Sequence, residues 1–143
     1  ILDIGERGIK GEWDYSDGSK LDYFIDKKKT YHGGRISPGI EMRYKSLDKF
    51  TNSLPKLTLN FEFNFIGNDT SSSIISGVQN GVLSEIDDII FNFRKENPDL
   101  FVIVTGGDTI FFEKGLKSKI FADQFFVLRG LNEILEYYDD TIY

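Results

Sequence analysis

The chain has 143 residues, no cysteine, a single histidine and a formal net charge of −6. Without cysteine it can form neither a disulfide nor a thiolate metal site, and one histidine argues against a histidine-rich metal site or a Ser-His-Asp triad. The acidic balance argues against a nucleic-acid partner, because proteins that bind a phosphate backbone use basic surfaces.

The first part of the chain predicts an antiparallel meander. Residues 1–5 have the pattern of a buried strand that carries Asp3 into a glycine turn. Strands are then predicted over residues 8–15, 21–25 and 30–36, with turns at 16–19 and 26–29. His32 and the lysine run at 27–29 fit the solvated surface of a hairpin better than any functional role.

A helix and an alternating segment follow the meander. Ser37 and Pro38 indicate a helix start, because serine is a common N-cap and proline suits the first helical position. This helix is expected to end near residues 54–55. Apolar and polar residues then alternate from 57 to 65, which predicts a strand with one buried face.

The chain is organised around residues 66–108. Apolar residues recur from Ile74 to Phe93 with the spacing of an amphipathic helix, and Pro98 follows its end. Residues 100–104 form an uninterrupted apolar run, which predicts a strand buried on both faces. This strand runs directly into a turn with two glycines, residues 105–108.

Both ends of this central unit could bind a ligand or could simply be structural. Asn68, Asp69 and Thr70 can cap the long helix, where unpaired N–H groups and the helix dipole favour an anion. Gly106 and Gly107 follow a buried strand, and glycine lets a backbone approach a ligand closely at that edge of a sheet. Taken alone, each feature is better explained by ordinary capping or an ordinary turn, whereas the two together on one helix–strand unit fit a ligand site equally well.

The last third predicts a short helix over 109–119, a strand over 125–128 and a helix over 129–138. Leu131, Ile134, Leu135 and Tyr138 are expected to face inward on the last helix. We therefore predict one α/β domain over 1–143 with a mixed sheet, antiparallel and parallel, and helices on both faces. This order is the pattern of a single ribonuclease-H-like half-domain.

No apolar run reaches the roughly 18 residues of a membrane span, and the first residues lack the pattern of a signal peptide. We therefore expect a cytoplasmic protein with no membrane partner. The length suits one compact domain with a substantial core.

Four motifs occur in an order and spacing that resemble the C-terminal half of type III pantothenate kinases. They are GGRISPGIEMR at 33–43, IGNDT at 66–70, TGGD at 105–108 and VLRGL at 127–131. The similar region covers about residues 20–138. The resemblance implies ATP-dependent phosphorylation of pantothenate, the first step of coenzyme A biosynthesis, by a homodimer that uses ATP, Mg²⁺ and a monovalent cation (K⁺ or NH₄⁺).

The same resemblance implies roles for individual residues. Thr105, Gly106 and Gly107 match the family's adenosine-side glycine turn, and Thr70 matches the threonine that contacts pantothenate across the dimer interface. Residues 3–10 resemble the family's first phosphate loop, D-x-G-N-T-x-x-K. On that basis Asp3, Gly5 and Lys10 are candidate ATP ligands, and Asp3 is also the candidate metal ligand.

The phosphate loop is altered on every alignment. Glu6 and Arg7 stand where the first loop has Asn and Thr, and an acid there repels phosphates. Asp3 and Gly5 can instead match the family's second loop, D-x-G-T, and residues 16–19 are a third candidate for that loop. The resemblance therefore implies that residues 1–19 are an altered phosphate-loop hairpin, and the alternative for Asp3 is a buried acid that caps backbone amides.

The family's G-x-D-R segment, whose Asp is the general base, has no counterpart in this sequence. No catalytic residue is therefore assigned, and little or no kinase activity is expected from this chain alone. One alternative is a non-catalytic, remodelled or engineered half-domain that acts as a folding or self-association module. A weaker alternative is a two-metal nuclease built on Asp3, Asp69 and Asp108, against which the acidic charge counts.

Overall fold

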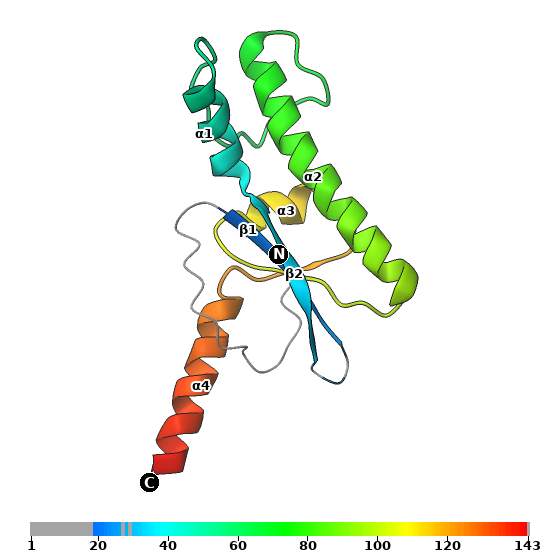
Figure 1. Cartoon of the computed structure of the whole chain (residues 1–143), viewed down its shortest axis with the longest axis vertical. Helices are drawn as coiled ribbons and strands as arrows, with labels where there is room; N and C mark the ends of the chain where they lie inside the picture. The colour runs from blue at the N-terminus through cyan, green and yellow to red at the C-terminus, as the bar shows by residue number, and fades with distance from the viewer. Residues whose placement is uncertain (1–18, 27, 29, 143) are drawn as a thin grey trace.

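The computed structural model describes residues 19–26, 28 and 30–142, which form two strand pairs and four helices (Figure 1). In chain order these elements are β1 (Ser19–Ile25), β2 (Tyr31–Pro38), α1 (Ile40–Phe50), α2 (Thr70–Glu96), β3 (Ile103–Val104), α3 (Thr109–Gly115), β4 (Phe121–Ala122) and α4 (Phe126–Ile142). The prediction of a mixed α/β fold is confirmed. Within the described residues the antiparallel and the parallel pair belong to separate two-stranded sheets.

The hairpin β1–β2 is the part of the meander that the structure describes. Its strands pair antiparallel from Ser19 opposite Pro38, and the register shifts after Tyr23. Asp26 organises the turn, because its Oδ1 accepts hydrogen bonds from the backbone N–H of Lys28 and Thr30. The strand predicted over 8–15 lies outside the described residues.

Helix α2 is the long amphipathic helix that the sequence predicts. Asp69 is its N-cap and forms a capping box with Ser72, each side chain accepting from the other's backbone N–H. Asn97 caps the other end, just before Pro98. The helix therefore begins and ends at residues whose chemistry favours those positions.

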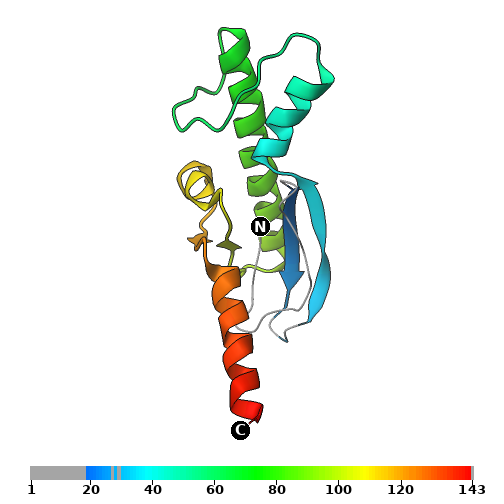
Figure 2. The same cartoon turned by 90° about the vertical axis from the view of Figure 1, so that its left-hand side faces the viewer.

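The core forms along the apolar face of α2. Figure 2 shows α2 between the hairpin on one side and α3 with the β3–β4 pair on the other. Phe24 of β1 stacks on Phe93, and Leu83 packs against Gly115 at the end of α3. Besides Leu83, the buried members of this hydrophobic cluster are Ile40, Tyr44, Ile74, Val78, Val82, Ile86, Ile89, Ile90, Val102, Val104, Phe111 and Phe112.

Residues 57–65 do not form the predicted strand, because side chains of α2 hydrogen-bond their backbone. Gln79 is completely buried, its Nε2 donates to Asn60 O at 2.7 Å, and its Oε1 accepts from Asn60 N at 2.8 Å. Ser76 donates to the carbonyl of Phe65, and Asn80 donates to that of Asn64. A helix thus supplies the hydrogen-bond partners that a neighbouring strand would otherwise provide.

The end of the chain also differs from the prediction. The strand predicted over 125–128 is the start of α4, because Asp123 accepts hydrogen bonds from the N–H groups of Phe125 and Phe126 and so begins a helix there. The strand lies earlier, as β4, and pairs parallel with β3. Leu131 and Leu135, predicted to face inward, are exposed.

The first helix also begins differently from the prediction. It starts at Ile40, and Ser37 does not cap it, since the Ser37 hydroxyl donates to Glu85 of α2 instead.

Lys20 of β1 and Arg43 of α1 form ion pairs with the same Glu85 carboxylate. Burial alone would raise the pKa of Glu85, but these hydrogen bonds and the Lys20 charge outweigh it and lower the pKa to about 2. One carboxylate thus holds the hairpin, α1 and α2 together.

None of the helices in the described part of the chain is long and apolar enough to cross a membrane.

We predict that Gln79→Leu lowers the free energy of unfolding by roughly 2–4 kcal/mol, because it removes the partners of both backbone groups of Asn60 and of the Tyr44 hydroxyl. Urea denaturation followed by circular dichroism measures this. The matched control is Gln124→Leu, the same change at an exposed position. An equal change in the free energy of unfolding for the two substitutions would show that the hydrogen bonds of Gln79 do not stabilise the protein.

Candidate functional site

The turn Thr105–Asp108, which joins β3 to α3, has a backbone that only glycine adopts readily. Gly106 has φ +97°, a conformation strained for residues with a Cβ atom. Its carbonyl accepts hydrogen bonds from the N–H and the hydroxyl of Thr109, at 3.3 and 2.6 Å. The turn is therefore fixed from the α3 side.

The outer side of this turn is open. Gly106 and Gly107 are exposed, and a Cβ atom built on Gly107 would meet no other atom within 4 Å. A ligand can therefore reach the backbone here without displacing a side chain. This agrees with the open glycine turn that the sequence predicts.

Two polar groups beside the glycines lack ordinary hydrogen-bond partners. The Thr105 hydroxyl oxygen is buried and finds no partner among the described residues. Asp108 is half-buried and occupies the N-cap position of α3 without a side-chain capping bond. Burial, and then the negative charge of Glu41 on α1, raise the pKa of Asp108.

These groups favour a ligand that donates hydrogen bonds or carries positive charge. Asp108 and Glu41 repel anions, so a phosphate is disfavoured beside them. Hydroxyl groups such as those of a ribose suit a carboxylate acceptor. Glu41 was missed by sequence reasoning, since nothing local in the sequence indicates that the first turn of α1 lies near the start of α3.

The N-terminal end of α2, the other candidate site, is occupied by its own cap. Asp69 accepts from Ser72 N at 2.8 Å, and hydrogen bonds from the backbone and side chain of Ser72 lower its pKa. An incoming anion would meet this charge, which favours the capping interpretation. Thr70 begins the helix and is exposed.

The predicted site residues that the structure describes do not lie together. Thr70 lies at the start of α2, whereas the Thr105–Gly107 turn leads into α3, which packs beside the middle of α2 (Figures 1 and 2). Asp3, Gly5 and Lys10 lie outside the described residues. Within the described part, no three His, Cys, Asp or Glu side chains are grouped so as to hold a metal ion.

The only histidine has a structural role in the hairpin. His32 Nε2 lies 2.8 Å from Asp26 Oδ2, and its ring packs against Phe24. The hydrogen bond from His32, followed by those from the turn backbone, lowers the pKa of Asp26 to about 2. This agrees with the prediction of a hairpin-surface residue.

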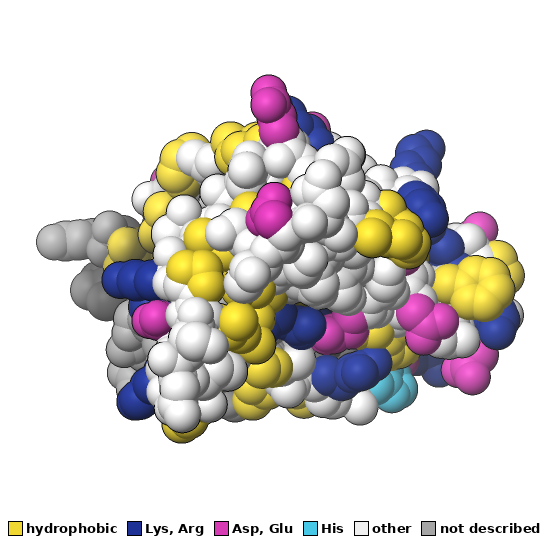
Figure 3. All heavy atoms as spheres, turned by 90° about the horizontal axis from the view of Figure 1, so that it is seen from above, with side chains coloured by type: hydrophobic (Ala, Val, Ile, Leu, Met, Phe, Trp, Pro, Cys, Tyr) yellow, Lys and Arg dark blue, Asp and Glu magenta, His cyan; other side chains and the backbone are white. Residues whose placement is uncertain are grey.

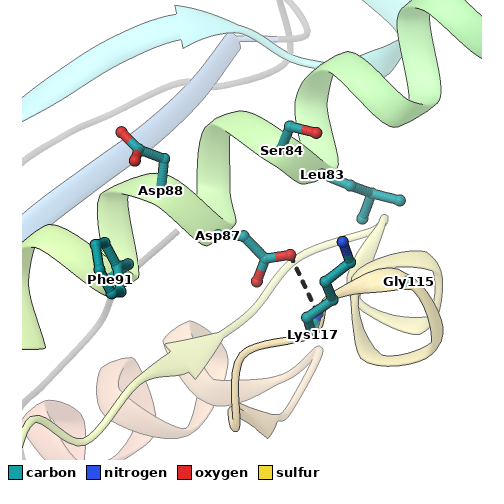
Figure 4. A pocket seen from close by; sticks show the side chains of 7 residues that line it. All are labelled: Leu83, Ser84, Asp87, Asp88, Phe91, Gly115 and Lys117. Atoms are coloured by element: carbon teal, nitrogen blue, oxygen red, sulfur yellow. Dashed lines mark hydrogen bonds between the residues drawn. The ribbon is translucent and has the colours of Figure 1, made fainter.

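An open groove of about 380 Å³ lies between α2 and the end of α3 (Figure 4). Asp87 points into it but is already hydrogen-bonded, since it accepts from the backbone N–H of Lys117 at 3.1 Å and of Ser118 at 2.9 Å. Of the predicted site residues that the structure describes, none lines this groove. The Thr105–Asp108 turn is therefore the stronger candidate site.

Residues 21–92 match the family model of type III pantothenate kinase. A type III pantothenate kinase of Phocaeicola vulgatus is 47% identical over 116 residues, which are 81% of this chain and 48% of that protein. The enzyme of the same description from Bacteroides fragilis is 44% identical over 119 residues, 83% of this chain and 49% of that one. The chain thus spans about half the length of the curated relatives it matches.

One solved structure shows the same fold at low identity. A Baf family protein from Campylobacter jejuni superposes with a TM-score of 0.61 at 20% identity, covering 86% of this chain and 55% of the other. At that identity the likeness concerns the fold alone.

We predict that Asp108→Asn stabilises the protein at pH 7 by about 0.5–2 kcal/mol, the usual range for a stabilising single substitution, because it removes a partly buried negative charge. Because the pKa of Asp108 is raised in the folded state, the ionised carboxylate destabilises the fold. This destabilisation is absent below pH 3.8, the ordinary pKa of the group, and develops as the pH rises through the folded-state pKa. In thermal melts from pH 3 to 7, the melting temperature of the variant should rise relative to that of the wild type as the pH increases. A loss of stability at pH 7 would instead assign Asp108 to capping α3.

Proposed function

The chain belongs to the type III pantothenate kinase family, and on this basis we propose that it is the C-terminal half of a cytoplasmic enzyme that phosphorylates pantothenate with ATP, the first step of coenzyme A biosynthesis. The observation that carries the proposal is the 47% identity over 116 residues, which extends beyond the matched family region. Residues 1–143 would form one ribonuclease-H-like unit, with 1–19 as its altered phosphate-loop hairpin.

The turn Thr105–Asp108 would bind the adenosine side of ATP. Its exposed glycines and the half-buried Asp108 carboxylate support this, because together they offer a close backbone approach and a hydrogen-bond acceptor for ribose hydroxyls. Phosphates would lie away from Asp108, near Asp3, Gly5 and Lys10. Asp3 would hold Mg²⁺, and the family resemblance adds a monovalent cation.

This chain alone would be a poor kinase. The missing G-x-D-R segment removes the general base, and Glu6 and Arg7 alter the loop that should neutralise phosphates. Because the chain spans about half the length of its relatives, the second candidate is a non-catalytic half-domain that acts in folding or self-association.

The chain would also form a homodimer through α2 and the segment leading into it. Gly77 and Gly81 are exposed on α2, and a Cβ atom on either would meet no described atom within 4 Å, so they do not serve to admit another described segment of the chain. Phe65 and Ile66, just before α2, are 78% and 77% exposed. Figure 3 views this end of the molecule and shows apolar side chains on its surface. Thr70, beside them, would contact pantothenate in the partner subunit.

We predict that the chain binds ATP with Mg²⁺ in isothermal titration and that Asp108→Asn weakens binding about tenfold or more, the effect of losing a hydrogen bond to a charged group. Asp88→Asn is the matched control, since Asp88 is exposed on α2 and bonds only Asn92 in the described structure. A coupled ADP assay should give turnover far below the roughly 1–100 s⁻¹ of kinases. If titration of ATP into the wild-type chain releases no heat of binding, the non-catalytic half-domain is the supported function. Turnover in the ordinary range would contradict the interpretation that the altered phosphate loop impairs catalysis.

We predict that Gly77→Leu combined with Gly81→Leu gives a folded monomer by light scattering. In a two-fold symmetric dimer the added side chains occur on both sides of the contact, so their disruptive effect is doubled. Asn92→Leu, which adds a leucine to an exposed position near the other end of α2, should remain a dimer. A wild-type chain that stays monomeric at high micromolar concentration would rule the dimer out.

A further inference from the structure

Two side chains of α2 hold the connection between α3 and β4 through its backbone. Asp87 accepts hydrogen bonds from the N–H groups of Lys117 at 3.1 Å and of Ser118 at 2.9 Å. Figure 4 shows this carboxylate pointing from α2 towards Lys117. Arg94 donates to the carbonyl of Lys119. Three successive residues of the connection are therefore bonded to one helix.

The two side chains are a major part of what attaches this connection to α2. Asp87 and Arg94 are about two turns apart, so both project from the same side of the helix. Packing contributes less here, because Leu116 and Ile120, the apolar residues of the connection, are only partly buried. Hydrogen bonds to charged groups, in contrast, are roughly twice as strong as those between neutral groups.

The connection leads directly into β4, and β4 holds the strand that ends at the glycine turn. Phe121 donates its N–H to the carbonyl of Val102 at 2.7 Å, and Asp123 donates to that of Val104 at 2.9 Å. Val104 is the last residue of β3 and precedes Thr105, where the turn begins. A pair of such short strands is marginal by itself, so the position of β4 depends on the attachment of the connection.

The Thr105–Asp108 turn is thus held from two directions. Its α3 side is fixed by the hydrogen bonds from Thr109 to the Gly106 carbonyl. Its β3 side is fixed through β4 and the connection by α2. We propose that Asp87 and Arg94 are positioning residues for this turn, which place its β3 end and so set its affinity for the adenosine side of ATP. The affinity part rests on the proposed function, in which this turn binds the nucleotide.

Amide hydrogen exchange followed by NMR tests the positioning without any ligand. Asp87→Ala removes both acceptor oxygens, while alanine keeps the helix favourable. The amides of Lys117 and Ser118 should exchange at least about tenfold faster, the effect of losing a hydrogen bond to a charged group. The Asp123 amide should also exchange faster. These gains are measured relative to the amide of Val82, which is completely buried in α2 and reports opening of the whole protein.

Neighbouring residues of like charge give the matched controls. Asp88→Ala removes the same charge from the next, exposed position of α2, and Lys95→Ala does so for Arg94→Ala. Both controls should leave exchange in the connection unchanged. Arg94→Ala releases the connection without altering Asp87, so it decides the question if Asp87→Ala fails to fold.

Two exchange results would overturn the proposal. If Asp123 and Val82 accelerate by the same factor, the substitution lowers the stability of the whole protein and does not act on the turn. If Lys117 accelerates while Asp123 does not, the connection does not hold β4.

Titration calorimetry measures the consequence for the ligand. Asp87→Ala should weaken the binding of ATP with Mg²⁺ about threefold or more, a usual size for a residue that acts through others. Adenosine titrated alone should lose the same factor, because the turn would hold that part of the nucleotide. Weakening of ATP alone, or of neither ligand, would overturn the proposal.

The outcome is separable from that of the proposed function. If the wild-type chain binds no ATP, the nucleotide proposal fails, and the exchange of Asp123 still decides whether Asp87 and Arg94 position the turn. Conversely, ATP binding that Asp87→Ala does not weaken would remove the positioning role and leave the nucleotide proposal standing.

Discussion

The burial of one face of α2 is the constraint on which the other elements depend. The hairpin reaches it through Phe24, α1 through Tyr44, and α3 through Gly115, each at a different level of the helix. The Gly115 contact is close, since a Cβ atom there would lie 2.8 Å from the Leu83 side chain. Helix α4 instead extends away from α2 (Figures 1 and 2), and several of its apolar side chains are exposed, so the same chain contains both a packed core and an exposed apolar helix face.

The sequence predicts α2 well because its signals are local. The cap at Asp69, the apolar period and Pro98 all lie within or next to the helix. The alternation over residues 57–65 is equally regular, yet alternation indicates only which side chains share a face. It does not identify the hydrogen-bond partner of the backbone, which here is Gln79 rather than a strand. The four apolar residues at 125–128 predict a strand in the same way, but Asp123 begins a helix there.

The candidate site was predictable in part for the same reason. Gly106 and Gly107 predict an open turn from a sequence of only four residues, 105–108. The environment of Asp108 depends on Glu41, far away in the chain, and so could not be predicted. The ion pairs of Glu85 join residues from three elements and were missed for the same reason. Local chemistry therefore indicated where the turn lies, whereas tertiary packing determines its electrostatics.

The attachment of residues 60–65 to α2 imposes an order of events in folding. Their backbone groups bond to Gln79, Ser76 and Asn80, side chains that share one face only once the helix exists. A strand could pair with any complementary strand that diffuses close, but this segment has no partner until α2 has formed. Its amide hydrogens therefore cannot be protected from solvent exchange more strongly than the helix that holds them, and local opening of that part of α2 releases the segment with it.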